Sequence, residues 1–425
     1  MENITLSRED LCRELEQMGL SARKAALELA VAPAEVRNNA LLAMAEELIA
    51  DTANLLCANA RDVDAARNNG VSGAMVDRLT LTPERIASMA DGLRQVAGQN
   101  DPVGRVLEEK IRPNGLKITK VSVPFGVIGI IYESRPNVTS DAAGICLKAG
   151  NAVMLRGGSE AFFSNSAIAK CLKKGLSGSG LPEAAVQVLP WIDREAVKAM
   201  LKLDRYIDLV IPRGGESLIR MVMQEATMPV LKHYKGVCHL FVDENTDYAQ
   251  ALNIVVNAKC QRPGVCNALE TLLVHQNAAP EFLPMLKEEM KRQQVELFGD
   301  ETVCSCIPEA SPATEDDWYR EYLSLKLAVK TVSGVIEAVD HINTYGSRHS
   351  DGILSRNNEN IAYFTGRVDS STVYVNASTR FTDGGEFGMG AEIGISTDKL
   401  HARGPMGADE LTSYKYLVFG NGQTR

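Results

Sequence analysis

The chain has 425 residues, of which 45% are hydrophobic and 23% charged, and its formal net charge at neutral pH is -9. This composition is typical of a folded globular protein with room for two or three domains, and it excludes a disordered chain. The negative charge and the dispersed basic residues argue against nucleic acid as a partner.

The sequence predicts a cytoplasmic protein without a membrane partner. Apolar runs stay well short of the ~20 residues of a membrane span, and the start, MENITLSREDLCREL, is acidic and amphipathic rather than a signal peptide. The nine cysteines are scattered singly and odd in number, which predicts thiols in a reducing compartment. Cys304 and Cys306 are one residue apart, which is not the spacing of a zinc or redox pair.

Residues 7–99 have the pattern of a helical lead-in. Ser7 with Asp10 has the spacing of a capping box, and Pro33 and the pair Thr82-Pro83 stand at the starts of further helices. Alanine and leucine recur every three or four residues through NNALLAMAEELIADTANLL, which predicts a face packed on a core.

Strand signals begin in KITKVSVPFGVIGIIY, after which short apolar strands alternate with helices. The predicted strands are VIGIIY, AVML, VQVL and IDLVI, separated by helices around residues 142–148, 167–173 and 195–201. This alternation predicts a doubly wound parallel sheet, which binds ligands at the carboxyl ends of its strands. Those ends read YESRPNVTSD, LRGGSE and IPRGGES, and they suit an anionic ligand. A Gly-x-Gly-x-x-Gly fingerprint is absent from the required place, so the pattern alone does not identify a dinucleotide site.

A second α/β unit is predicted beyond Met228. Its signals are HYKGVCHLFVDENTDY, the stretch KCQRPGVCNALETLLVH, LSLKLAVKTV, a helix over residues 335–344, and STVYVN. The tail LTSYKYLVFG alternates and is apolar, which predicts a strand that must be paired, and pairing between subunits would meet this need.

Cys266 follows a Pro263-Gly264 turn and precedes an apolar run, so we expect it where a loop enters a strand. Lys259 and Arg262 add positive charge upstream, which favours a reactive thiolate. The alternative is that Cys266 is a small hydrophobic residue of a buried strand.

Three long stretches carry a resemblance: IIYESRPNVTSDAAGICLKAGNAVMLRGGSEA, QRPGVCNALETLLV and LTSYKYLVFGNGQTR. They resemble the aldehyde dehydrogenase superfamily, in particular its branch that reduces glutamyl phosphate in proline biosynthesis. The resemblance implies an α/β fold with two doubly wound parallel-sheet domains and a small oligomerisation element. It assigns residues 1–108 and 125–230 to NADP binding, 231–391 to catalysis, and the hairpin 109–124 with 411–425 to oligomerisation.

The resemblance also implies an activity, which is the NADPH-dependent reduction of L-glutamate 5-phosphate to L-glutamate 5-semialdehyde. The reaction would release phosphate through a cysteine thioester, without a metal. The implied partners are further copies of the chain and the glutamate 5-kinase that makes the substrate.

Cys266 matches the nucleophile of the superfamily, and Asn137 matches the asparagine that completes the oxyanion hole with the backbone N–H of Cys266. Arg156 stands where many relatives have a lysine on the adenosine ribose, and its guanidinium suits a 2′-phosphate. Ser159, in the same LRGGSE loop, is also assigned to the cofactor. From the residues alone, Asn137 could be a turn residue and Arg156 a surface charge.

Gly214 and Gly215 resemble the glycines that let the nicotinamide approach the backbone. Glu321 resembles the glutamate on the nicotinamide ribose, although a solvated charge at a helix end is the alternative. The candidates for holding the α-carboxylate and amino group of the substrate are Arg135, Arg262 and Arg380. Each of them could equally be a surface charge.

His233, in HYKG, departs from the superfamily pattern. Hydrolytic members carry a general-base glutamate in a Glu-Leu-Gly-Gly motif at this place. A reductase must keep water away from its thioester until hydride arrives, so loss of that base fits a reductase. The alternatives are a hydrolytic aldehyde dehydrogenase and a non-catalytic protein of the same fold, and His233 itself could be structural.

Overall fold

The computed structural model describes residues 7–425, so the first six residues of the predicted acidic start lie outside the described residues. The chain forms two compact units. Unit 1 extends to residue 232 and includes residues 388–394 and 406–425, and unit 2 comprises residues 233–387 and 395–405. The assignment of nucleotide binding to the first unit and of catalysis to the second stays a prediction.

Unit 1 begins with the predicted helical lead-in, which is confirmed. Ser7 caps the first helix by accepting a hydrogen bond from the backbone N–H of Asp10, and Thr82 caps the fifth, with Pro83 in its first turn. Pro33 is the N-cap of the second helix. The helices are α1 (Arg8–Leu29), α2 (Ala34–Ala50), α3 (Thr52–Asn68), α4 (Gly73–Leu79) and α5 (Pro83–Ala97).

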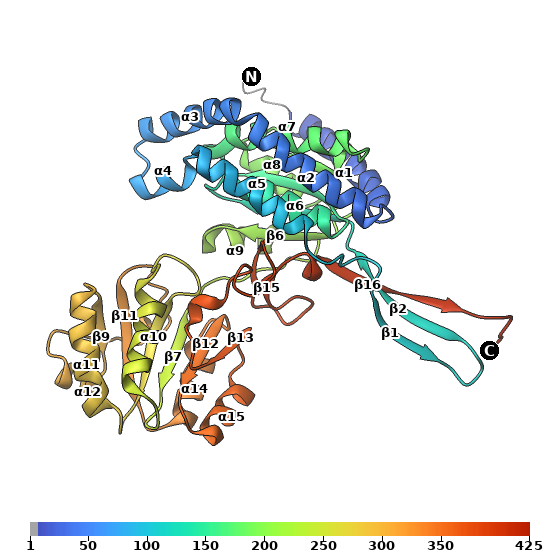
Figure 1. The fold of residues 1–425 in the computed structure, drawn as a ribbon. Helices are drawn as coiled ribbons and strands as arrows, with labels where there is room; N and C mark the ends of the chain where they lie inside the picture. The colour runs from blue at the N-terminus through green and yellow to red at the C-terminus, as the bar shows by residue number, and fades with distance from the viewer. Residues whose placement is uncertain (1–6) are drawn as a thin grey trace. The chain divides into compact units, whose positions relative to one another are not determined.

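A parallel sheet of four strands in the order β5-β4-β3-β6 forms the centre of unit 1. Helices α1, α6, α7 and α9 pack against its strands (Figure 1). The strands are β3 (Val127–Tyr132), β4 (Ala152–Gly157), β5 (Val186–Val188) and β6 (Leu209–Arg213), and the helices that follow them are α6 (Asn137–Lys148), α7 (Phe162–Gly178), α8 (Arg194–Met200) and α9 (Glu216–Glu225).

Two predicted boundaries in unit 1 were wrong, the end of strand β6 and the start of helix α6. Strand β6 continues through Pro212 to Arg213, beyond the predicted IDLVI. It is an edge strand, where a proline without an N–H removes no hydrogen bond from the ladder. Helix α6 begins at Asn137, well before the predicted start near residue 142, because Pro136 at its N-cap has a right-handed helical backbone (φ -57°, ψ -33°) rather than the extended one.

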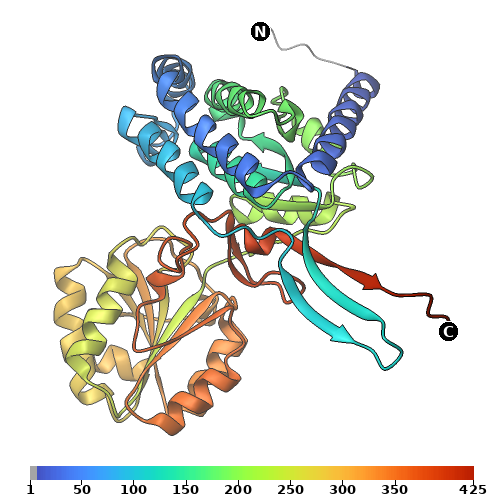
Figure 2. The same ribbon diagram turned by 45° about the vertical axis from the view of Figure 1, so that its right-hand side comes forward.

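A separate antiparallel sheet extends from unit 1 (Figure 2). Its strands are β1 (Val106–Ile111), β2 (Lys117–Pro124) and β16 (Thr412–Phe419), and β2 lies between the other two. The C-terminal strand predicted from LTSYKYLVFG is therefore confirmed and pairs with the predicted hairpin.

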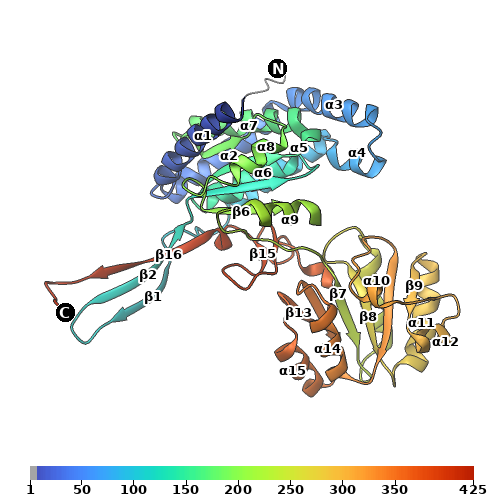
Figure 3. The same cartoon turned by 180° about the vertical axis from the view of Figure 1, so that it is seen from behind.

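Unit 2 is built on a parallel sheet of seven strands in the order β10-β9-β11-β8-β7-β12-β13 (Figure 3). Side chains alternate between the two faces, so that Leu240 and Val242 of β7 join one apolar core while Phe241 joins the other. The strands are β7 (Cys238–Val242), β8 (Leu269–His275), β9 (Glu296–Gly299), β10 (Ser311–Pro312), β11 (Lys326–Val332), β12 (Ser350–Leu354) and β13 (Thr372–Val375). The helices are α10 (Tyr248–Cys260), α11 (Ala279–Arg292), α12 (Glu301–Cys306), α13 (Glu315–Trp318), α14 (Val335–Tyr345) and α15 (Asn358–Arg367).

The short strands β14 (Gly394–Ser396) and β15 (Gly404–Met406) pair with each other. None of the nine cysteines, all of which lie within residues 7–425, forms a disulfide bond. Within residues 7–425, no helix combines the length and apolar character that crossing a membrane requires.

Candidate active site

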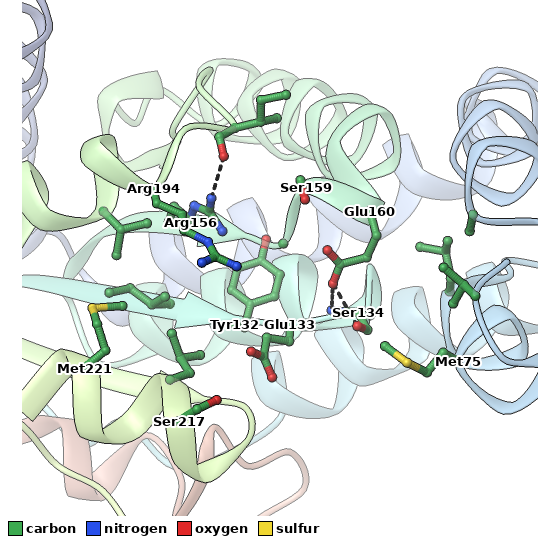
Figure 4. A pocket seen from close by; sticks show the side chains of 18 of the residues that line it. Met75, Tyr132, Glu133, Ser134, Arg156, Ser159, Glu160, Arg194, Ser217 and Met221 are labelled. Carbon is green, nitrogen blue, oxygen red and sulfur yellow. Dashed lines mark hydrogen bonds between the residues drawn. The ribbon is translucent and has the colours of Figure 1, made fainter. Parts of the chain in front are cut away.

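A cavity of about 780 Å³ opens in unit 1 beside the carboxyl ends of β3 and β4 (Figure 4). Parallel sheets place ligand sites at this edge, because the loops that follow the strands meet there. Polar and charged side chains on its wall include Glu133, Ser134, Arg156, Ser159, Glu160 and Arg194. Two predicted cofactor residues, Arg156 and Ser159, therefore share one cavity.

Two glutamates that the sequence patterns did not indicate hold the loops of this cavity. Glu160 accepts hydrogen bonds from the backbone N–H and the hydroxyl of Ser134, both at 2.7 Å. Glu133 accepts from the backbone N–H of Gly215 at 2.9 Å. A Cβ at Gly214 would lie 2.4 Å from Oε2 of Glu133, so the close approach of this carboxylate requires glycine. The Gly214-Gly215 pair thus adjoins the wall of the cavity.

Arg156 is the penultimate residue of β4, and part of its guanidinium makes no hydrogen bond within the described residues. Nη2 donates to the carbonyl of Ile192 at 2.9 Å, while the buried Nε has no hydrogen-bond partner in the described part of the chain. Burial lowers the pKa of Arg156 from its ordinary value. Arg194 and Lys198 line the same cavity. An unpaired buried donor among cationic groups fits an anionic ligand such as a phosphate.

Asn137 is the first residue of α6, in unit 1, and its side-chain amide is held by Asp141 one turn later. Nδ2 of Asn137 donates to Oδ2 of Asp141 at 2.8 Å. A primary amide carries two N–H donors, so this bond fixes the amide and leaves a second donor. Burial raises the pKa of Asp141 to about 6, against the lowering effect of the Asn137 hydrogen bond. Asp141 was not among the predicted residues, because the predicted helix began near residue 142 and so did not show that Asn137 and Asp141 are one helical turn apart.

Cys266 lies in unit 2, partly exposed, in the turn between α10 and β8, as predicted. The glycine of HYKG packs directly on its backbone, because a Cβ at Gly236 would lie 1.8 Å from the carbonyl oxygen of Cys266. The N–H of Gly236 donates to Glu321 at 2.7 Å, and the thiol of Cys238 donates to the Cys266 carbonyl at 3.3 Å. The structure thus brings HYKG and Glu321 to the Cys266 turn.

Two histidines approach the thiol. One ring nitrogen of His233, one of His349 and Sγ of Cys266 all lie within 4.8 Å of one another. His233 is oriented by a 2.8 Å hydrogen bond between Nδ1 and the carbonyl of Ile395. His349 is fully buried, and its burial, followed by the nearby His233, lowers its pKa to about 3. No local sequence pattern indicated His349.

The three candidate substrate arginines do not share one unit. Arg135 is half-buried in unit 1 between β3 and α6, whereas Arg262 and Arg380 belong to unit 2. Arg380 donates from Nε to Gln261 at 2.9 Å and from Nη1 to Asn267, the residue after Cys266. Burial, and then the charge of Arg262, lower the pKa of Arg380. A cationic pair therefore lies beside the Cys266 turn.

Lys259 does not supply the open positive charge that its position suggested. It is completely buried and donates to Glu270 at 2.7 Å and to the Leu269 carbonyl at 2.8 Å. Burial raises the pKa of Glu270 to about 7 against the influence of this lysine. The pair fixes the end of α10 to β8, so that expectation was wrong.

Comparison with known proteins agrees with this architecture. The model of the aldehyde dehydrogenase family matches residues 10–311. A gamma-glutamyl phosphate reductase of Geobacter metallireducens is 54% identical over 415 residues, which cover 98% of this chain and 99% of that relative. The chain belongs to the aldehyde dehydrogenase family.

Other members of this family support the same placement over the full length. A gamma-glutamyl phosphate reductase of Caldanaerobacter subterraneus subsp. tengcongensis is 53% identical over 412 residues, which cover 97% of this chain and all of that relative. The crystal structure of gamma-glutamyl phosphate reductase from Thermotoga maritima superposes with a TM-score of 0.95 at 47% identity, covering 97% of this chain and 100% of that one. The resemblance noted in the sequence and the α/β fold with parallel sheets are thereby confirmed.

Proposed function

We propose that this chain reduces L-glutamate 5-phosphate to L-glutamate 5-semialdehyde with NADPH, releasing phosphate through a thioester on Cys266. The single observation that carries the mechanism is the setting of Cys266. It is partly exposed in a turn, with an imidazole near it at the place where hydrolytic relatives carry a glutamate. A thiol without a water-activating carboxylate suits an acyl-enzyme that waits for hydride.

The cavity in unit 1 is the proposed nucleotide site. Its orphaned Arg156 Nε and the neighbouring Arg194 and Lys198 fit the phosphates of NADP, with Arg156 assigned to the 2′-phosphate. Ser159 lines the same cavity and is assigned to cofactor binding. Gly214 and Gly215 are assigned to the nicotinamide end and Glu321 to its ribose, as the family resemblance implies.

The thiolate of Cys266 attacks the acyl carbon of glutamate 5-phosphate, and the carbon–oxygen bond to phosphate breaks. The developing oxyanion accepts hydrogen bonds from the Asn137 amide and the Cys266 N–H, the donors that the resemblance assigns. Bound NADPH supplies the hydride that reduces the thioester. Collapse of the thiohemiacetal releases the aldehyde and restores the thiolate. Arg135, Arg262 and Arg380 are the candidates for holding the polar groups of the substrate, and Arg262 and Arg380 belong to the same unit as Cys266.

Running the reaction backwards tests this proposal. The enzyme is supplied with glutamate semialdehyde and NADP, with and without inorganic phosphate, and NADPH is followed by absorbance. Formation of NADPH should require phosphate and should be lost in Cys266→Ala, while Cys306→Ala, at an exposed cysteine, serves as the matched control. Phosphate-independent turnover would favour a hydrolytic aldehyde dehydrogenase, and no turnover under any condition would favour a non-catalytic protein.

Assembly into a homo-oligomer through the β1-β2-β16 sheet is part of the same proposal. Every residue of β1 is exposed, and apolar side chains on the two edge strands face solvent, among them Ile111 at 72% and Tyr416 at 56% exposure. Edge strands with such side chains are covered in stable proteins. Deleting residues 412–425 should therefore reduce the mass measured by light scattering. Transfer of substrate from glutamate 5-kinase is the remaining proposed partnership.

A further inference from the structure

The approach of His233, Cys266 and His349 follows from the topology of unit 2. Strands β8, β7 and β12 are neighbours in the sheet and run parallel. Cys266 lies just before β8, His233 just before β7 and His349 directly before β12. Parallel neighbours have their amino ends at one edge, so three residues far apart in sequence meet there.

His349 has one ring nitrogen with contacts and one without a hydrogen-bond partner among the described residues. Its Nδ1 is 2.9 Å from the hydroxyl of Ser350 and 3.7 Å from the thiol of Cys238. Its Nε2 is buried and has no hydrogen-bond partner anywhere in residues 7–425, and its ring meets the ring of His233 edge to face, with centroids 5.6 Å apart. A buried polar nitrogen without a partner is costly, and beside a second imidazole and a thiol it can bind a cation.

Two imidazoles and one thiolate form a ligand set that zinc prefers. Zinc–nitrogen bonds of about 2.0 Å and zinc–sulfur bonds of about 2.3 Å in tetrahedral geometry separate the ligand atoms by about 3.3–3.6 Å. The three atoms of the cluster lie within 4.8 Å of one another, so these separations must shorten by up to about 1.5 Å to close the site. His233 and Cys266 both lie outside regular secondary structure and can make this shift, while the buried His349 stays fixed.

We propose that His233, Cys266 and His349 bind one thiophilic divalent cation, best matched by Zn²⁺, and that the bound cation blocks the thiol. On binding, the S–H bond of Cys266 breaks, its proton passes to solvent, and a sulfur–metal bond forms without any change of oxidation state. A fourth coordination position stays open for water. The bound cation inhibits the enzyme by occupying the thiol and takes no part in the proposed reaction. Its effect on turnover rests on the proposed function, whereas the binding itself does not.

Cobalt(II) gives a test that does not depend on turnover. Co²⁺ is titrated without oxygen into the full-length metal-free protein, and the near-ultraviolet charge-transfer band of a thiolate–cobalt bond is recorded. One Co²⁺ per chain should produce the band, and Zn²⁺ should displace it. Cys266→Ser should remove the band. His349→Asn should weaken Co²⁺ binding by more than about 100-fold, since the loss of even outer-shell partners costs about 10–100-fold.

The matched control is His341→Asn. His341 is also a buried histidine whose Nε2 has no hydrogen-bond partner among the described residues, but it does not belong to the cluster. This variant should bind Co²⁺ like the parent. A parent without the band, a band retained in Cys266→Ser, or parental affinity in a folded His349→Asn would each overturn the proposal.

Activity separates this proposal from the proposed function. Zn²⁺ should inhibit the phosphate-dependent reverse reaction, and a chelator should restore it. A protein that binds Co²⁺ through Cys266 yet never turns over would support the metal site and contradict the proposed function. An active enzyme without the band and without zinc inhibition would support the proposed function and contradict the metal site.

Discussion

Replacement of Gly236 by alanine is expected to displace the backbone of Cys266. The added Cβ would lie 1.8 Å from the carbonyl oxygen and 2.6 Å from the Cα of Cys266. Non-bonded carbon and oxygen atoms come no closer than about 3.3 Å, so the two segments must separate by about 1.5 Å. A misplacement of ~1 Å at a reacting group can cost about 100-fold in rate, so we expect kcat to fall by about 100-fold or more.

The assay is the phosphate-dependent reverse reaction, combined with thermal unfolding and with the rate at which iodoacetamide alkylates Cys266. Nucleotide affinity should fall less than kcat, because the cavity assigned to the nucleotide belongs to unit 1 and only Glu321, which accepts from the Gly236 N–H, would be disturbed. Gly366→Ala is the matched control: Gly366 lies in α15 with no atom within 4 Å of its added Cβ, and alanine favours a helix. A folded Gly236→Ala enzyme with parental kcat would refute the idea that this contact positions the thiol.

Three further changes test the other parts of the proposed site. Asn137→Ala should lower kcat by ~100-fold with little change in substrate affinity, as expected for one oxyanion donor, and steady-state kinetics with a parental kcat would contradict this role. Arg156→Leu should raise the KM for NADPH and leave that for NADH nearly unchanged, because only NADPH loses a charge-assisted contact; equal effects on both would exclude 2′-phosphate recognition. Asp141 has a pKa of about 6 in the folded protein against an ordinary value of 3.8, so the folded state binds more protons than the unfolded state between these values. The free energy of unfolding of the parent should therefore fall relative to that of Asp141→Asn by up to about 3 kcal/mol as pH rises through this window, and urea denaturation showing no relative change would contradict the raised pKa.

Local sequence patterns determined the elements of the fold. The strand predicted from the continuous apolar run VIGIIY has the observed bounds of β3, Val127–Tyr132. A strand that is buried on both faces is apolar at every position, so its two ends are visible in the sequence. The turn that carries Cys266 was predicted from the adjacent Pro263-Gly264 pair, because these residues restrict the backbone whatever surrounds them. Such features depend on neighbours in the chain, so they can be read from the sequence directly.

Contacts between distant segments were decided by tertiary structure. The order β8-β7-β12 brings the segments before three strands to one edge, and no periodicity encodes that order. Because strand order is not encoded locally, no sequence pattern could show that His349 lies near the thiol of Cys266. Nor could it show that Gly236 must be glycine to fit against Cys266. The charge of Lys259 was misjudged because its partner, Glu270, lies on another element and both are buried. Sequence fixes which backbone shapes each segment can adopt, whereas the sheet order and the burial it imposes decide which side chains meet and which charges are paired.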